Sequence, residues 1–171
     1  MTDLEPVLRD LVIANRILAN ENVVDAYGHV SVRSPLDPER YFLSCSRSPE
    51  LVQRSDIMEF RLDGTPVTLL VVNMDQGRDL ARQLAGNRIA LMRGHGFAAT
   101  GRNLSEVVRV SVMLPRNARI LTTALQFGGV RPLSPGEVAL RQDMDPDHKA
   151  FYRAWEYWAT RAGCGDMLGE S

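Results

Sequence analysis

Three neighbouring stretches decide the fold that we expect for this chain: residues 29–33 (His-Val-Ser-Val-Arg), 34–38 (Ser-Pro-Leu-Asp-Pro) and 41–43 (Tyr-Phe-Leu). Polar and apolar residues alternate in the first stretch, the second is rich in turn residues, and the third is apolar. This order predicts an antiparallel hairpin. Residues 56–60 (Asp-Ile-Met-Glu-Phe) alternate in the same way and precede a turn signal at Leu62-Asp-Gly64, which predicts a third strand.

Further elements are predicted on both sides of this hairpin. Apolar residues at helical spacing predict a helix with one buried face from residue 4 to about residue 20, opened by a capping box of Thr2 and Glu5. The apolar run 68–72 is typical of a buried strand. A helix is expected after it, over residues 75–85.

The second half of the chain contains a strand, tight turn and strand pattern over residues 89–100, followed by a long helical pattern over residues 104–127. Pro115 lies inside the long helix and is expected to kink or break it, because proline lacks the N–H that the helix needs at that position.

Two shorter helices are predicted at the C-terminal end. Ser134 and Glu137 form a capping box around a proline at the first helical position. The last helix opens at Asp145-Pro146, carries aromatic residues on one face and stops at Gly163. The elements together predict a mixed α/β fold in which helices flank a largely antiparallel sheet.

Composition limits the function. The 171 residues suit a single domain, and 20 basic against 21 acidic residues leave no charged surface that would favour nucleic acid or an anionic membrane. The chain shows neither a signal peptide nor an apolar run long enough to span a membrane, so we expect a cytoplasmic location. Lys149 is the only lysine and lies among acidic residues, which argues against Schiff-base catalysis.

Gly94-His95-Gly96 is the sharpest local motif. Glycines on both sides of a histidine at a strand end allow a tight turn and leave the imidazole projecting from a rigid edge, which suits a metal ligand. The alternative is an ordinary hairpin turn, and the spacing alone favours that alternative. The spacing does not match the glycine-rich loop of a dinucleotide-binding fold.

A second group of polar residues surrounds the predicted hairpin. Gly28 could free backbone amides, and His29, Ser31 and Arg33 share one strand face by their spacing of two, which suits binding of a carboxylate or phosphate. The alternative is the solvent face of an edge strand. The loop 44–48 adds the hydroxyls of Ser44, Ser46 and Ser48 and the guanidinium of Arg47, although a plain polar connection has the same composition.

These segments together resemble a known family. Residues 22–33, 42–49 and 56–66 are similar to the opening of class II aldolase/adducin domains, and residues 90–101 with the following helix are similar to the closing half. The histidine at position 29 resembles the branch that decarboxylates hydroxylated aromatic or muconic-type acids. The resemblance implies a single domain over residues 1–171 with three α-β-α layers around the sheet.

The resemblance also implies roles for particular residues. His95 corresponds to one of three histidines that bind a divalent metal, usually zinc. A small anionic substrate would lie against Gly28, His29, Ser31, Arg33, Ser44, Ser46, Arg47 and Ser48. The implied reaction is cleavage of a carbon–carbon bond, by decarboxylation or retro-aldol cleavage, through a metal-stabilised enolate. The family commonly forms homotetramers, so we expect a homo-oligomer.

One part of the family pattern is missing. The other two metal ligands form a His-x-His pair, with a catalytic glutamate shortly before it, and this chain has neither, as if residues were deleted near positions 66–69. No catalytic residue is therefore assigned. Two hypotheses follow from the sequence: a metal-dependent lyase, or a non-catalytic adducin-like domain that lacks a complete metal site.

Overall fold

The computed structural model describes residues 4–62, 78, 80–82, 84–92, 96–142 and 149–169, without the side chains of residues 141, 142, 149 and 150. Three antiparallel strands form its first sheet, in the order β1 (Ser31–Arg33), β2 (Arg40–Ser44) and β3 (Ile57–Arg61). The predicted hairpin and third strand are confirmed. Phe42 of β2 lies between Val32 and Glu59 of its neighbours, so these three side chains share one face of the sheet.

The second sheet is the hairpin of β4 (Ile89–Met92) and β5 (Gly96–Ala99), in which Ile89 pairs with Ala99 and Met92 with Gly96. This confirms the two predicted strands, whereas residues 93–95 of the predicted turn lie outside the described residues. Residues 78, 80–82 and 84 are helical, as predicted for this stretch. The strand predicted over residues 68–72 also lies outside the described residues.

Helix α1 (Glu5–Asn20) supplies most of the core. Its buried side chains include Leu11, Ile13 and Ile17. The helix starts after Leu4, which makes no side-chain cap, and Thr2 of the predicted capping box lies outside the described residues. The Glu5 carboxylate accepts a hydrogen bond of 2.7 Å from Arg54, which lies in a short 3₁₀ helix (Arg54–Asp56) directly before β3.

Helix α3 (Leu104–Gln126) continues through Pro115, so of the two predicted effects the break does not occur, and the kink stays a prediction. Proline removes only one helical hydrogen bond, and the turns before it are held against the core by the buried residues Val108 and Val112. The helix ends at Gln126, just before Gly128, whose φ of 121° is a backbone conformation that suits glycine.

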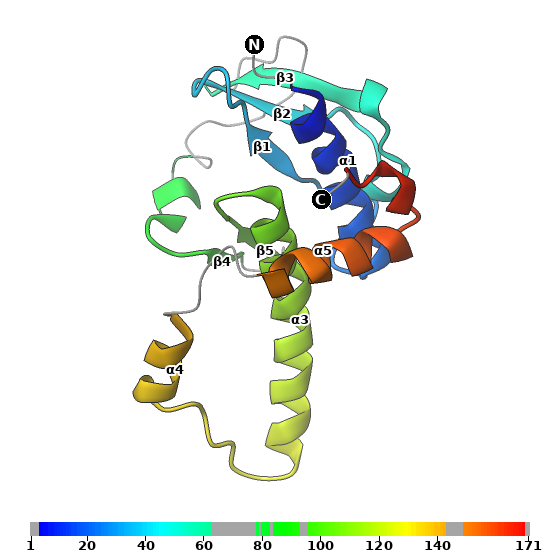
Figure 1. Cartoon of the computed structure of the whole chain (residues 1–171). Coiled ribbons are helices and arrows are strands. Elements are labelled where there is room, and N and C mark those ends of the chain that lie inside the picture. The colour runs from blue at the N-terminus through cyan, green and yellow to red at the C-terminus, as the bar shows by residue number, and fades with distance from the viewer. Residues whose placement is uncertain are drawn as a thin grey trace.

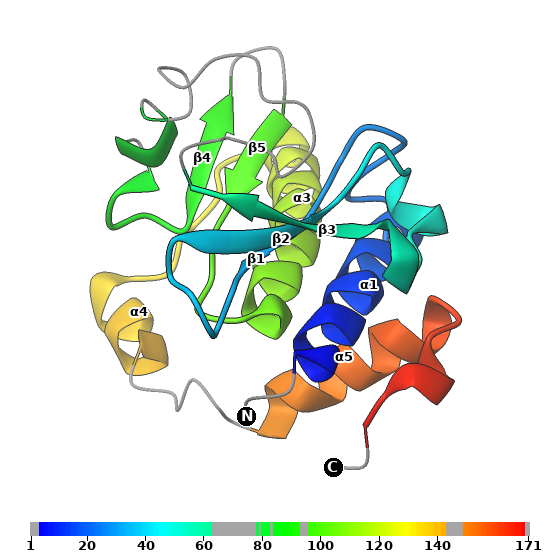
Figure 2. The ribbon, with the colours of Figure 1, turned by 90° about the horizontal axis from the view of Figure 1, so that it is seen from above.

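Helix α5 (Lys149–Arg161) closes the core. Trp155 and Trp158 are both buried on the face that meets the other helices, and Gly163, with a φ of 71°, follows the end of the helix as predicted. Helices α1, α3 and α5 all contact one another, and α1 also contacts β1. Figures 1 and 2 show this helical group beside the three-stranded sheet, with the β4–β5 hairpin next to the first half of α3.

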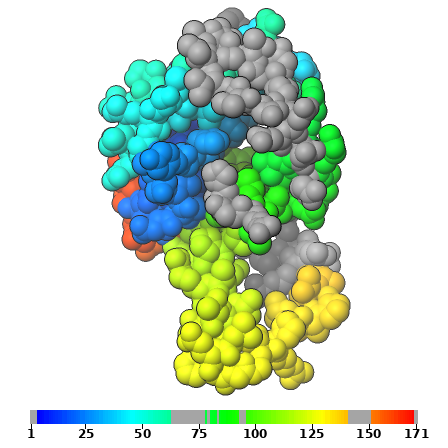
Figure 3. All heavy atoms as spheres, turned by 180° about the vertical axis from the view of Figure 1, so that it is seen from behind, coloured from blue at the N-terminus to red at the C-terminus, as the bar shows by residue number. Residues whose placement is uncertain are grey.

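The second half of α3 and helix α4 (Pro135–Gln142) project from this body. Side chains from residue 117 to residue 140 are exposed, apart from a half-buried Ala124. In Figure 3 this part of the chain, in yellow, extends well beyond the rest. The predicted capping box of α4 is confirmed, since the Glu137 N–H donates to the Ser134 hydroxyl and the Glu137 carboxylate accepts from the Ser134 N–H.

The fold is thus a mixture of helices and antiparallel sheet, as predicted. The described strands form two separate sheets, and the expected arrangement in three layers stays a prediction. Within the part of the chain that the structure describes, no helix has both the length and the apolar content for crossing a membrane.

Candidate functional site

The two predicted substrate-binding segments leave the first sheet at the same end. β1 begins at Ser31 and β2 ends at Ser44, and because the two strands are antiparallel, residues 28–30 and 45–48 extend from one edge of the hairpin. The Cys45 N–H donates to the Asp56 carbonyl at 2.9 Å, so the pairing of β2 with β3 continues into the second segment. We call these two segments the hairpin end.

His29 is exposed at this end, while Gly28 is half-buried against the segment that follows α1. The sequence predicts that glycine at position 28 frees backbone amides. In the structure it also meets a packing requirement, because its backbone passes close to Val24. The sequence signal for this second role is weak, since close backbone approach leaves no motif.

Ser44 does not join the other predicted residues. Strand register places Ser31 opposite Leu43 and Arg33 opposite Tyr41, so Ser31 and Arg33 share a face with those two residues. Ser44 points to the other face of the sheet, the face that carries the core residue Phe42, and it is buried. Among the residues predicted to bind an anion, the structure therefore places Ser31 and Arg33 on one face of the sheet and Ser44 on the other.

Arg33 lies at the far end of β1. Its guanidinium donates a hydrogen bond to the Pro38 carbonyl, within the turn that joins β1 to β2. The turn is at the opposite end of the hairpin from residues 45–48. Arg33 is thus not brought together with Ser46, Arg47 and Ser48.

The segment 45–48 is a tight loop. Ser46 has a φ of 44°, and the Ser48 carbonyl accepts from the Leu51 N–H at 2.9 Å to open a short 3₁₀ turn. Arg47 Nε donates to the Leu51 carbonyl at 3.2 Å and lies 3.8 Å from Asp56 Oδ2. The guanidinium is held in place on one side while its remaining N–H groups are available to solvent or a ligand.

The hairpin end therefore presents an imidazole, hydroxyls and one positioned guanidinium from His29, Ser46, Ser48 and Arg47. Hydroxyl, imidazole and guanidinium donors suit a carboxylate, and the guanidinium can bind both of its oxygens at once. These groups can bind and orient an acid.

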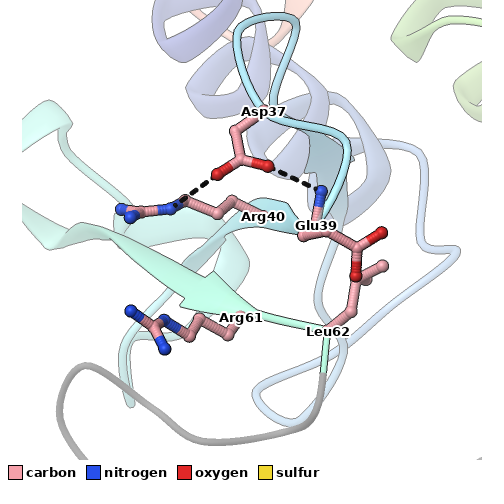
Figure 4. Close-up of a pocket in the computed structure, with 5 residues that line it drawn as sticks. All are labelled: Asp37, Glu39, Arg40, Arg61 and Leu62. Atoms are coloured by element: carbon pink, nitrogen blue, oxygen red, sulfur yellow. Dashed lines mark hydrogen bonds and ion pairs between the residues drawn. The ribbon is translucent and has the colours of Figure 1, made fainter.

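The structure also contains a hollow that sequence reasoning missed, at the turn end of the same hairpin. It has a volume of about 270 Å³ and is lined by Asp37, Glu39, Arg40, Arg61 and Leu62. Figure 4 shows that Asp37 bridges the Arg40 guanidinium and the Glu39 N–H. The turn residues at 34–38 predict a loop at this place. They do not predict which residues of other strands lie next to the loop and complete the hollow.

Arg40 is the best-paired group in this hollow. Its Nη1 lies 2.8 Å from Glu59 Oε2 and its Nε lies 3.0 Å from Asp37 Oδ2. The hydrogen bond with Glu59 raises the pKa of Arg40 above its ordinary value. Two carboxylates and two guanidiniums line the hollow, so its charges balance and do not favour an anion. The hairpin end is the stronger candidate site.

The metal prediction falls on residues that the structure does not describe. His95 and His148 lie outside the described ranges, and within those ranges no three His, Cys, Asp or Glu side chains come together as a metal site would require. The described residues thus do not supply a ligand set, and we assign no step to a metal ion. The role of His95 stays a prediction.

Comparison with known proteins gives a distant relative but no family. No family model matches the chain. A protein named decarboxylase tropJ, from Talaromyces stipitatus, is 21% identical over 253 aligned residues, covering 94% of this chain and 95% of the relative. The chain is distantly similar to a decarboxylase. The class II aldolase/adducin resemblance stays a prediction.

The alignment with this relative is longer than the chain itself. The 253 aligned residues exceed the 171 residues of the chain, so the relative has residues without a counterpart here. Because nearly all of both proteins is covered, those residues are internal to the match. The alignment length does not give the position of those residues, and the deletion expected near positions 66–69 stays a prediction.

Proposed function

We propose that this chain is a carbon–carbon lyase of the decarboxylase kind, which acts on a hydroxylated aromatic or muconic-type acid. The observation that carries the proposal is the similarity to a decarboxylase along 94% of the chain, from the N-terminal elements to the C-terminal helix. Retro-aldol cleavage is the related reaction that the class II aldolase/adducin resemblance implies, because both reactions leave the electron pair of the broken carbon–carbon bond as a negative charge that has to be stabilised.

The hairpin end supports the binding step. Arg47 would hold the substrate carboxylate through N–H groups that its contacts with Leu51 and Asp56 leave available. The hydroxyl of Ser46 and the imidazole of His29, both on exposed residues, would bind the remaining oxygens or the ring hydroxyl. The proposal keeps His95 as one ligand of a divalent metal, as the family resemblance implies, and such an ion, when bound, would supply Lewis-acid stabilisation of negative charge.

A non-catalytic domain is the second candidate. It is favoured by the alignment, in which the relative has internal residues that this chain lacks. Such a domain would keep the acid-binding hairpin end and lose turnover. The expected homo-oligomer is a proposal under either function.

Separate measurements of binding and turnover test both candidates. Binding of hydroxybenzoic and muconic-type acids is measured by calorimetry, and loss of the carboxyl group is followed with and without added Zn²⁺ or Mn²⁺. Binding with turnover supports the lyase. Binding without turnover supports the non-catalytic domain, and absence of binding by a folded protein contradicts both.

A further inference from the structure

Three arginines surround one buried carboxylate at the start of α3. The Glu106 side chain is only 5% exposed, and its Oε1 lies 2.5 Å from Arg88 Nη1 and 3.9 Å from Arg109 Nη2. Its Oε2 lies 3.1 Å from Arg102 Nε and accepts a 2.8 Å hydrogen bond from the Arg102 N–H. Among these four side chains, three positive charges face one negative charge.

The excess positive charge is accessible. Arg88 is 58% exposed and Arg102 is 51% exposed, and each guanidinium has five N–H donors, of which Glu106 can occupy only a part. Arg109 is more buried and lies over the Phe151 ring, 3.8 Å from its centre. Burial lowers the pKa of Arg109, and the neighbouring charges of Arg88 and Arg102 lower it further against the opposing effect of Glu106.

The backbone around the cluster fixes these positions. The Arg88 carbonyl accepts from the Thr100 N–H at 2.8 Å, so Arg88 is tied to the end of the β4–β5 hairpin. The Asn103 side chain accepts from the Glu106 N–H at 2.8 Å and caps the 23-residue helix α3. The positive end of the helix dipole therefore adds to the charge of the arginines.

This place differs from the candidate sites described above. Arg88 and Thr100 lie at one end of the β4–β5 pair, and Met92 and Gly96 lie at the other. The two ends are separated by strands of four residues, or roughly 13 Å at about 3.3 Å per residue. The residues of the hairpin end directly precede β1 and follow β2 of the other sheet.

We propose that Arg88 and Arg102, supported by Arg109 and the start of α3, bind a phosphate group. A phosphate dianion would balance the excess charge, and its oxygens suit paired N–H donors of guanidinium groups. A single carboxylate would balance only half of it. The ligand class is therefore a phosphorylated small molecule or inorganic phosphate.

The test is a titration of the full chain with inorganic phosphate, followed by calorimetry and by NMR shifts of the 88–109 amides, at constant ionic strength set with chloride. We expect saturable binding to one site, weakened about tenfold or more by Arg88→Gln, since a charged hydrogen bond contributes about 1.5–3 kcal/mol. Arg102→Gln should have a similar effect. Arg119→Gln, an exposed arginine farther along α3, is the matched control and should leave the affinity unchanged.

Thermal unfolding of each variant is recorded first, so that affinity is compared only between folded proteins. If Arg102→Gln does not fold, Arg88→Gln alone decides, because Arg88 is the more exposed and makes one contact with Glu106. Phosphate that does not saturate, or that binds wild type and Arg88→Gln equally, overturns the proposal. A phosphorylated sugar that competes with inorganic phosphate would identify a small-molecule ligand as the source of the phosphate group.

Discussion

Val24 and Gly28 lie so close that a Cβ atom placed on Gly28 would be 2.3 Å from the Val24 Cβ. Real side-chain atoms do not approach to this distance, so one of the two segments must move if residue 28 carries a side chain. Val24 packs against the core, whereas residues 28 and 29 lead into the hairpin end. The contact thus links the position of the candidate site to the packing of α1.

Gly28→Ala should lower the free energy of unfolding by about 1–3 kcal/mol, the usual cost of overpacking. Denaturant unfolding measures this change. Gly129→Ala is the matched control, because a Cβ at position 129 meets no atom within 4 Å. Equal stability of the two variants would show that the backbone near Val24 gives way without cost.

Glu106→Gln should destabilise the protein at neutral pH by about 1–3 kcal/mol, because the carboxylate holds three arginines and is itself buried. Urea unfolding of both proteins at pH 7 measures the difference. A variant as stable as the wild type would mean that the ion pairs only offset the cost of burying the charge.

The same substitution should change the pH dependence of stability. Burial raises the pKa of the Glu106 carboxyl, but hydrogen bonds from Arg102 and the charges of Arg88 and Arg102 outweigh it, so the pKa lies below its ordinary value of 4.5. The ionised Glu106 carboxylate therefore contributes its full stabilisation above pH 4.5, and this contribution is lost as pH falls through the lower pKa of the folded state. The difference between wild type and Glu106→Gln should shrink on acidification, and a difference that grows would contradict this sign.

Ser134→Ala should loosen α4 without affecting the core. The serine hydroxyl accepts from the Glu137 N–H and donates to the Glu137 carboxylate, and removal of such a cap costs about 0.5–2 kcal/mol. Hydrogen exchange of the α4 amides should become faster while the melting temperature hardly changes, because α4 is exposed. Ser134→Asp retains a capping oxygen and serves as the control. A cooperative loss of the whole fold would mean that α4 is part of the core.

Arg47→Gln should weaken acid binding at the hairpin end about tenfold, the value of one charged hydrogen bond. Calorimetric titration with a hydroxybenzoic acid measures it. Arg33→Gln is the comparison, since Arg33 is directed to the Pro38 carbonyl at the other end of the hairpin and should have little effect. A larger loss of affinity in Arg33→Gln than in Arg47→Gln would indicate that the acid binds at the turn end of the sheet.

The sequence predicted local structure well where a short motif carries the whole signal. The strands around Phe42 and the cap at Ser134 depend on alternation and on spacing within a few residues, and the structure contains both. Pro115 shows the limit of such rules, because tertiary contacts of Val108 and Val112 hold a helix that local chemistry alone would interrupt.

The candidate site was less predictable, because it depends on where strand ends and side-chain faces meet. The spacing of two correctly places Ser31 and Arg33 on one face, but it does not reveal that Ser44 faces the core or that Arg33 reaches the turn. The ion-pair cluster of Glu106 was also not predicted. Its arginines come from a strand end, a loop and a helix, and only the fold brings them together.

Release of CO₂ tests the proposed function most directly. Purified protein is incubated with hydroxybenzoic and muconic-type acids labelled at the carboxyl carbon, with Zn²⁺ or Mn²⁺ supplied, and the labelled gas is measured by mass spectrometry. We predict release above the protein-free rate for at least one acid, reduced in the Arg47→Gln variant. A folded protein that binds the acids and releases no labelled CO₂ with either metal would contradict the decarboxylase assignment.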